Sequence, residues 1–481
     1  MVHRPTTPPR LVTVPSRRLS LWQSAAEQTV RERLGAAGAA GGRALLLAHP
    51  LVEAVNRHVA AENRGEKLAP PGEPGTGAAS PAYLSMLHLR HAEAVRNVDT
   101  VEQSAIEAQF RYYSDQDYLR WASCETTYLA YRPSPPEVQY RDWQVQGGGN
   151  LDYSLIDYQL PDDATVAIIG DWGTGMNDAE SLLMEVVGRH QPQAIIHLGD
   201  IYYSGTPQEC MLNFTAVVQN VFNVFGVNLP VFTIPGNHDY YDWGSGFYGL
   251  IDTINASNPA WRQDASYFCL RTQDGLWQFL GMDTGQDDSD PIDEVHPAQG
   301  PVLRSSECTW HQDKLNPAKF DGTTILLSHH QVFSTHETIN NDPDLKPYLN
   351  ASLLDVFQPH LGQVAGWFWG HEHNLALFQD GLFGVAKGRL LGSSAYEESQ
   401  GDDPYEVVYA EVPYQPYGGQ TVELGMVDEY YNHSYAIVDL SRAEPTDPVS
   451  VAYYQIPSWG GEQSTSLPPG QKWQLATEEL S

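Results

Sequence analysis

The sequence predicts an α/β fold, and two observations support this prediction. From about residue 164, short apolar runs alternate with windows whose apolar residues have helical spacing, as in Leu182, Leu183, Val186 and Val187. Alternating strands and helices are typical of layered α/β domains. In addition, several of the apolar runs end in polar side chains that can bind metal ions, which is common where strands lead into a functional site.

Six of the expected strands carry these endings or lie beside them. We predict strands at 165–171, 193–200, 230–239, 276–284, 323–330 and 363–374, with helices at 177–190 and about 208–224. Two later stretches, 407–414 and 434–440, also have strand composition. We expect them to complete a sheet rather than to form a separate domain.

The first 150 residues have a different texture. Residues 20–63 and 82–122 are predicted to be mostly helical, and the Pro/Gly-rich stretch 65–81 between them is predicted to be a linker or exposed loop. We therefore predict a mainly helical N-terminal region of unknown role at 1–155 and a second domain at 156–481. A lid, an oligomerisation element and a docking module are all compatible with the first region, and its partner is unknown.

The charge is divided unevenly. Residues 1–150 contain 16 basic and 15 acidic residues, whereas residues 151–481 contain 11 basic and 45 acidic ones. Nucleic-acid binding depends on Lys and Arg side chains that neutralise phosphates, so the second part is a poor candidate for it. If this part handles a phosphate group, metal ions must supply the positive charge.

The cysteines and the N-terminus favour a cytoplasmic protein. Cys124, Cys210, Cys269 and Cys308 are widely separated, which indicates free thiols rather than a disulfide framework or a zinc knuckle. Arg17 and Arg18 are followed by polar residues rather than by the apolar segment of an export signal. No run approaches the roughly 18 to 20 apolar residues of a membrane span.

The ends of the apolar runs carry the chemistry. They supply Asp171, Asp200 with Tyr203, Asn237 with His238 and Asp239, His329, and finally His371 with His373. Ligands bind beyond the carboxyl ends of strands in open α/β sheets. Oxygen and imidazole donors without a thiolate suit Fe, Mn or Zn. The donors exceed the needs of one ion, and two ions about 3.5 to 4 Å apart, bridged by a carboxylate, would suit displacement at phosphorus.

The ordered series GD, GDxxY, GNHD, H and GHxH resembles the calcineurin-like metallophosphoesterases, and more narrowly the purple acid phosphatases. The stretches VAIIGDWGTG, GNHDYY, GMDT, HHQVFS and GHEHNLALF are similar to the small, tartrate-resistant kind. The resemblance covers about residues 164–400. It implies a four-layer α/β/β/α sandwich, here with an N-terminal mainly helical extension.

The resemblance also implies a ligand set. The first metal would be held by Asp171, Asp200, Tyr203 and His373, with Asp200 bridging to a second metal held by Asn237, His329 and His371. A Tyr203 phenolate favours Fe(III) at the first site, with a visible charge-transfer band, and the second ion would be Fe, Zn or Mn. Whether His329 or its neighbour His330 is the ligand stays open.

The implied activity is hydrolysis of a small phosphorylated substrate, a phosphomonoester, by attack of a metal-bound hydroxide. His238 would stabilise the transition state or donate a proton to the leaving group, with Asp239 orienting it. Phosphodiesterase branches of the family have a histidine where Gly173 stands, so Gly173 and Tyr203 together favour the monoesterase.

Two other functions stay open. One is a phosphodiesterase that acts on cyclic nucleotides or phospholipid head groups, because loops around the metal core set the substrate. The other is a non-catalytic interaction scaffold, which the presence of every expected ligand disfavours. The acidic stretch 286–300 is predicted to be an exposed loop, with a pocket-lining role and a phosphate contact from His296 as the alternative.

Overall fold

A computed structural model of the chain shows two compact units. It describes residues 11–12, 17–66, 83, 86–87, 90–91, 94, 99–113, 138–288, 300–458 and 467–481. One unit comprises Met1–Glu137 with Tyr241–Trp243, and the other comprises Val138–Tyr240 with Gly244–Ser481. The predicted boundary near residue 155 stays a prediction. Residues 138–155 belong to the second unit, where Trp143 donates hydrogen bonds to Tyr267 and to the Ser306 carbonyl.

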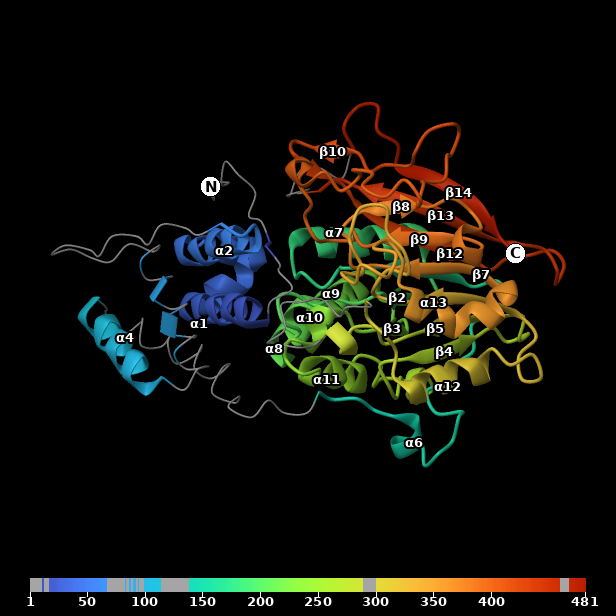
Figure 1. Ribbon diagram of the computed structural model, residues 1–481, viewed down its shortest axis with the longest axis horizontal. Helices are drawn as coiled ribbons and strands as arrows, with labels where there is room; N and C mark the ends of the chain where they lie inside the picture. Colours follow the sequence, from blue (N-terminus) through green and yellow to red (C-terminus); the bar gives the residue numbers. More distant parts are fainter. Residues whose placement is uncertain are drawn as a thin grey trace. The chain divides into compact units, whose positions relative to one another are not determined.

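The described part of the first unit is helical, as the sequence predicts. It contains α1 (Arg17–Leu47), α2 (Pro50–Asn63) and α4 (Thr100–Tyr113). Helix α2 begins at Pro50 and buries Val52, Val55 and Val59, whose spacing places them on one face. Helices α1 and α2 pack against each other (Figure 1). The predicted linker is largely outside the described residues.

The second unit contains two six-stranded sheets. The first has the order β14-β13-β12-β1-β2-β3 and the second the order β4-β5-β6-β7-β9-β8. The strands of the first sheet are β1 (Thr165–Ile169), β2 (Ala194–His197), β3 (Val231–Thr233), β12 (His433–Asp439), β13 (Val449–Ile456) and β14 (Gln474–Leu480). Those of the second are β4 (Phe268–Arg271), β5 (Trp277–Gly281), β6 (Thr323–Leu327), β7 (Val364–Trp369), β8 (Leu375–Leu377) and β9 (Gly388–Leu391). A small ribbon, β10 (Met426–Val427) with β11 (Tyr430–Tyr431), stands apart.

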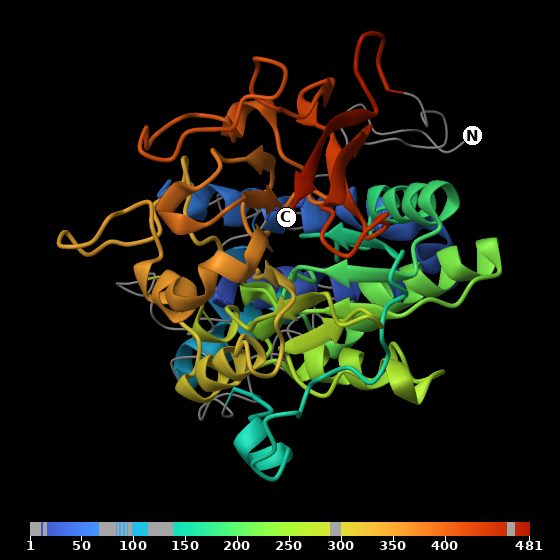
Figure 2. The ribbon, with the colours of Figure 1, turned by 90° about the vertical axis from the view of Figure 1, so that its right-hand side faces the viewer.

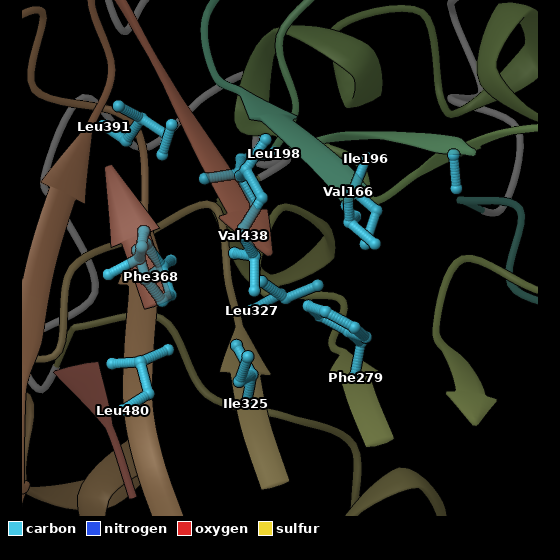
Figure 3. Close-up of a cluster of buried hydrophobic side chains, with 14 of the residues drawn as sticks. Val166, Ile196, Leu198, Phe279, Ile325, Leu327, Phe368, Leu391, Val438 and Leu480 are labelled. Atoms are coloured by element: carbon cyan, nitrogen blue, oxygen red, sulfur yellow. The ribbon is translucent and has the colours of Figure 1, made fainter. Parts of the chain in front are cut away.

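The main core lies between these sheets. Figure 3 shows side chains from both of them meeting, including Val166, Ile196, Phe279, Ile325 and Phe368. Each such side chain contributes about 1.5 to 3 kcal/mol when it is fully buried. Alternate residues point the other way: Ala167 and Ile169 pack with the helices outside the first sheet. Burial on both faces explains why these strands are uninterrupted apolar runs.

Helices cover the two outer faces. The first sheet packs against α7 (Asn177–Glu185) and α9 (Ala216–Phe225), and the second against α12 (Ser305–Lys314) and α13 (Ala351–Phe357). The other α-helices described in this unit are α6 (Trp143–Gln146), α8 (Pro207–Glu209), α10 (Asn237–Tyr240) and α11 (Ser245–Thr253). This succession of helices, sheet, sheet and helices confirms the predicted four-layer sandwich.

The C-terminal strands join the first sheet, as predicted. Strand β12 pairs antiparallel with β1, and β13 and β14 continue outward from it. Figure 2 views these red and orange strands from the side. The predicted strand at 407–414 is wrong. The stretch forms turns in which Val407 and Val408 are exposed, and Pro413 has no N–H for a ladder.

Two further expectations concern the whole chain. Cys210, Cys269 and Cys308 have free thiols, whereas Cys124 lies outside the described residues. Among the helices that the structure describes, none combines the length and the apolar composition needed to cross a bilayer.

Candidate metal centre

Five strands deliver the predicted site residues to one region. Strands β1, β2 and β3 are mutually parallel, and so are β6 and β7. Their carboxyl ends lead into Asp171, Asp200, Asn237, His329 and His371. Because parallel strands end at the same edge of a sheet, these residues from five separate stretches come together.

Two carboxylates and one imidazole form the centre of this group. Single ligand atoms of Asp171, Asp200 and His329, all buried, lie within 4.8 Å of one another. Nδ1 of His329 contacts the Leu198 carbonyl at 2.9 Å, and this carbonyl can only accept. Nδ1 therefore carries the proton, and Nε2 is left with a lone pair among the donors.

The second group extends from this nitrogen. His329 Nε2 lies 3.1 Å from Asn237 Oδ1, 3.5 Å from Asp200 Oδ1 and 3.3 Å from His371 Nδ1. These are the donors predicted for the second metal, together with the predicted bridging carboxylate. The structure therefore brings together Asn237, His329 and His371 around Asp200.

The geometry distinguishes His329 from His330. Although one His330 nitrogen lies within 4.8 Å of ligand atoms of His329 and His371, both ring nitrogens face other groups. Nδ1 is 3.1 Å from the Thr284 hydroxyl, and Nε2 is 3.4 Å from Asp288 Oδ2. This arrangement favours His329 as the ligand and makes His330 a neighbour of the site.

The tyrosine of the first metal site is less simple. The hydroxyl of the neighbouring residue, Tyr202, lies 2.9 Å from Asp171 Oδ1 and 3.2 Å from His373 Nε2. The Tyr203 backbone N–H donates to Glu209, and the Tyr203 carbonyl accepts from Nδ1 of His238. The ligand role of Tyr203 stays a prediction, and Tyr202 becomes a second candidate for it.

His373 completes the first group. Its Nε2 lies 3.6 Å from Asp171 Oδ1, and its Nδ1 lies 3.6 Å from Glu398 Oε2. Burial by itself lowers the pKa of His373, but the neighbouring carboxylates of Asp171 and Glu398 outweigh it and raise the pKa to about 10. Asp171, Asp200, His373 and one tyrosine thus surround the predicted first metal position.

His238 and Asp239 have separate anchors. Nδ1 of His238 donates to the Tyr203 carbonyl at 2.5 Å, and its Nε2 faces Asp200 Oδ2 at 4.0 Å. Asp239 Oδ2 instead accepts the backbone N–H groups of Asp200 and Gly236, at 2.9 Å each. The described contacts therefore assign the orientation of His238 to the Tyr203 carbonyl, and Asp239 joins two loops that carry ligands.

The backbone is strained where the ligands stand. Asp171, Asp200 and His371 have φ values of 54°, 73° and 73°, in the left-handed region that side chains other than glycine rarely adopt. Such residues cost of order 1 to 3 kcal/mol each and cluster at functional sites. A Cβ on Gly236 would lie 2.1 Å from Asp200 Oδ1, so the chain passes too close to the ligands for any larger residue.

The electrostatics fit a cation. Burial and the nearby Asp171 raise the pKa of Asp200 well above its ordinary value, and burial lowers the pKa of His329 well below its own. Two carboxylates buried side by side favour a nearby positive charge, and the neutral imidazole of His329 has a lone pair to offer. Carboxylate, amide, phenol and imidazole donors together match the predicted two-metal centre.

Several neighbours of the site were not among the predicted site residues. Tyr202, Thr284 and Glu398 touch predicted ligands or His330, and Thr284 follows Asp283 in the stretch GMDT. Glu398 stands in SSAYEES, where no motif signals a site. His296 lies outside the described residues, so its predicted phosphate contact stays a prediction.

Part of the chain matches a known protein family. Residues 164–375 match the family model of the calcineurin-like phosphoesterases. Two curated relatives, from Mus musculus and Rattus norvegicus, are both named cyclic GMP-AMP phosphodiesterase SMPDL3A. The mouse protein is 24% identical over 186 residues and the rat protein 23% over 182, in each case 36% of this chain and 40% of the relative. The match thus spans about two fifths of the length of these relatives.

Two solved structures have lower sequence identity to the chain but cover more of it. GAP50, described as the anchor in the inner membrane complex of Plasmodium, has 13% identity and a TM-score of 0.40, with 66% of this chain and 88% of that chain covered. Purple acid phosphatase PPD1 from yellow lupin (Lupinus luteus) seeds has 13% identity and a TM-score of 0.37, with 62% and 52% covered.

Proposed function

Residues 164–375 form a calcineurin-like phosphoesterase domain, and from this premise we propose that the protein hydrolyses phosphate esters at a pair of metal ions. One observation carries the proposal. Asp171, Asp200 and His329 come from three strand ends, and one ligand atom of each lies within 4.8 Å of the others. The positive φ of both aspartates supports it, because strain of this kind persists where function requires it.

The predicted ligands would form two sets, one for each ion. Asp171, Asp200, His373 and one of the tyrosines would hold the first ion, and Asn237, His329 and His371 the second, with Asp200 shared. When bound, the two ions activate water for attack on phosphorus and neutralise the charge of the phosphate oxygens. An iron(III) ion at the tyrosine position, with iron, zinc or manganese at the other, stays part of the proposal.

His238 would act on the substrate rather than hold an ion. Because its Nδ1 proton is engaged by the Tyr203 carbonyl, Nε2 is the nitrogen directed to the reacting phosphate. Burial lowers the pKa of His238 to about 3, so the imidazole is held neutral. In that state Nε2 is a proton acceptor, and it must first take a proton from water or from a phosphate oxygen before it can stabilise the phosphate oxygens as a cation or donate to the leaving oxygen.

The substrate class has two candidates. We propose a phosphomonoester, on the basis of Gly173 and the tyrosines. A phosphodiester is the second candidate, because the mouse and rat relatives are named cyclic GMP-AMP phosphodiesterases. A non-catalytic scaffold is disfavoured by the assembled donors. The cytoplasmic location stays a prediction.

One experiment tests the proposal. The purified protein should contain about two metal ions per chain by mass spectrometry and should hydrolyse p-nitrophenyl phosphate faster than bis(p-nitrophenyl) phosphate. The reverse preference would favour the diesterase. His238→Ala should keep both ions while turnover falls by about 100-fold or more. A protein that lacks metal after exposure to iron, zinc and manganese, or that cleaves neither ester when loaded, would contradict the proposal.

A further inference from the structure

His373 lies between two carboxylates. Its Nε2 is 3.6 Å from Asp171 Oδ1 on the predicted metal side, and its Nδ1 is 3.6 Å from Glu398 Oε2 on the other side. An imidazole that binds a metal through Nε2 keeps its proton on Nδ1. The proton left on His373 would therefore face Glu398.

The segment that carries Glu398 is anchored next to the site. The Ser394 hydroxyl accepts the Gly170 N–H at 3.0 Å, and the Ser394 N–H donates to the Gly170 carbonyl at 3.0 Å. Farther along, the Glu398 carbonyl accepts the Tyr431 N–H at 2.9 Å. The segment is thus tied to the residue before Asp171 at one end and to β11 at the other.

An aromatic ring holds the same imidazole. The ring of Tyr396 lies 3.8 Å from that of His373, centroid to centroid, with 31° between the planes. Tyr396 also packs against Tyr202, at 5.1 Å. Tyr396 and Glu398 are two residues apart in one segment, so the same piece of chain fixes both the plane of the imidazole and the direction of its Nδ1.

We propose that Glu398 is a positioning residue for the first metal: its carboxylate keeps the Nδ1 N–H of His373 on the side away from the ion and so directs the Nε2 lone pair to the ion. This inference rests on the proposed metal centre. Glu398 lies beyond residues 164–375, the part that matches the family, so this chain completes its site with a carboxylate from its C-terminal portion. Loss of such an outer carboxylate typically weakens metal binding by about 10- to 100-fold.

Glu337 provides a matched control. Its Oε2 lies 4.0 Å from Nε2 of His371, a ligand of the second metal, but its side chain is 41% exposed, compared with 15% for Glu398. Water competes with an exposed carboxylate, so Glu337 should hold its histidine more weakly. Neutralising each carboxylate in turn therefore compares a less exposed partner with a more exposed one.

The test measures metal affinity rather than turnover. Wild type, Glu398→Gln and Glu337→Gln are freed of metal and titrated with zinc and with cobalt(II) in buffers of fixed free-ion concentration, and bound metal is counted. We expect Glu398→Gln to weaken binding at one site by about 10- to 100-fold and Glu337→Gln to weaken it by less than about threefold. The visible spectrum of bound cobalt should change in Glu398→Gln only, and the metal-free melting temperatures should agree.

Three results would overturn the proposal. They are an affinity of Glu398→Gln within about twofold of wild type, a weaker affinity matched by a lower metal-free melting temperature, and an unchanged cobalt spectrum. Failure of the proposed function is distinguishable, because a wild-type protein that binds two ions but cleaves no phosphate ester leaves the affinity comparison intact. Wild type that binds neither zinc nor cobalt would overturn both.

Discussion

The two sheets contribute different chemistry to one site. The first sheet supplies the oxygen donors Asp171, Asp200 and Asn237 from the ends of β1, β2 and β3. The second supplies the nitrogen donors His329, His371 and His373 from the ends of β6 and β7. The proposed metal centre takes its donors from both sheets, so it can form only when the two layers pack together. The carboxylates of the first sheet carry negative charge that a cation would balance. The imidazoles of the second sheet favour borderline metals.

We expect the largest effect when the charge of Asp200 is removed, because this residue lies where the donors of the two sheets meet. Asp200 Oδ1 accepts the His238 N–H at 3.1 Å and lies 3.5 Å from His329 Nε2. Asp200→Asn keeps the shape but removes the shared carboxylate. We expect loss of bound metal and a fall in kcat of at least a thousandfold, or about 4 kcal/mol. Metal analysis beside the ester assay checks this, and a variant that keeps both ions would contradict the bridging role.

Single substitutions distinguish the roles of two adjacent histidines, His329 and His330. His329→Ala should reduce the bound metal from about two ions to about one and lower activity by about 100-fold, because a ligand is lost. His330→Ala should keep both ions, because its nitrogens face Thr284 and Asp288. Metal counts on the two variants, prepared in parallel, decide the matter. Equal losses from both would contradict the distinction.

A buried carboxylate outside the predicted ligand set allows a separate test on stability. Glu307, on α12, accepts hydrogen bonds from the Tyr140 hydroxyl at 2.7 Å and from the Asp283 N–H at 2.9 Å, and burial raises its pKa to about 8. The folded state therefore holds a proton that the unfolded chain loses near pH 4.5, the ordinary pKa. The resulting stabilisation is complete below pH 4.5 and is lost as the pH rises through about 8.

Glu307→Gln removes this proton exchange. We expect the free energy of unfolding to vary less with pH between about 5 and 8 than in wild type, with the gap between the two profiles changing by a few kcal/mol over that range. Urea unfolding at several pH values measures it. Glu479→Gln, at an exposed site on β14, is the control and should leave the profile unchanged. Parallel profiles for wild type and Glu307→Gln would show that Glu307 is ionised in the folded protein.

The smallest effect separates the two adjacent tyrosines. If iron(III) binds the Tyr202 hydroxyl, Tyr202→Phe should abolish the visible charge-transfer band while Tyr203→Phe keeps it, and activity should change by no more than about tenfold. The spectrum of the iron-loaded variants is the measurement. Loss of the band in Tyr203→Phe alone would restore the ligand predicted from the sequence.

Much of the fold and of the site could be predicted from the sequence because the signals are local. A strand buried on both faces is an apolar run, so Thr165–Ile169 and Thr323–Leu327 are visible in the sequence, and the polar residues after them mark the site. The stretch 407–414 has a similar composition but lies in turns. Composition alone does not distinguish these cases, since burial is decided by the surrounding chain.

The remaining details depend on the direction of side chains and on contacts between residues that are distant in the sequence. Asp200 adopts a positive φ, which interrupts the alternation of side chains that a strand would have, so spacing alone does not determine whether Tyr202 or Tyr203 faces Asp171. His329 and His330 are distinguished by partners that are distant in sequence, among them Leu198, Thr284 and Asp288. Glu398 reaches His373 through a segment that returns past Gly170, and no local pattern reveals such a contact.

The pairing of β1 with β12 has a consequence for any shortened form of the protein. Strand β1, which leads to Asp171, is hydrogen-bonded to β2 on one side and to β12 on the other. A chain cut after residue 375 would keep every predicted ligand yet leave β1 with a bare row of backbone donors and acceptors. Such an edge invites pairing with other chains. We therefore expect the family-matched residues, produced alone, to aggregate, and the smallest autonomous unit to extend to the C-terminal strands.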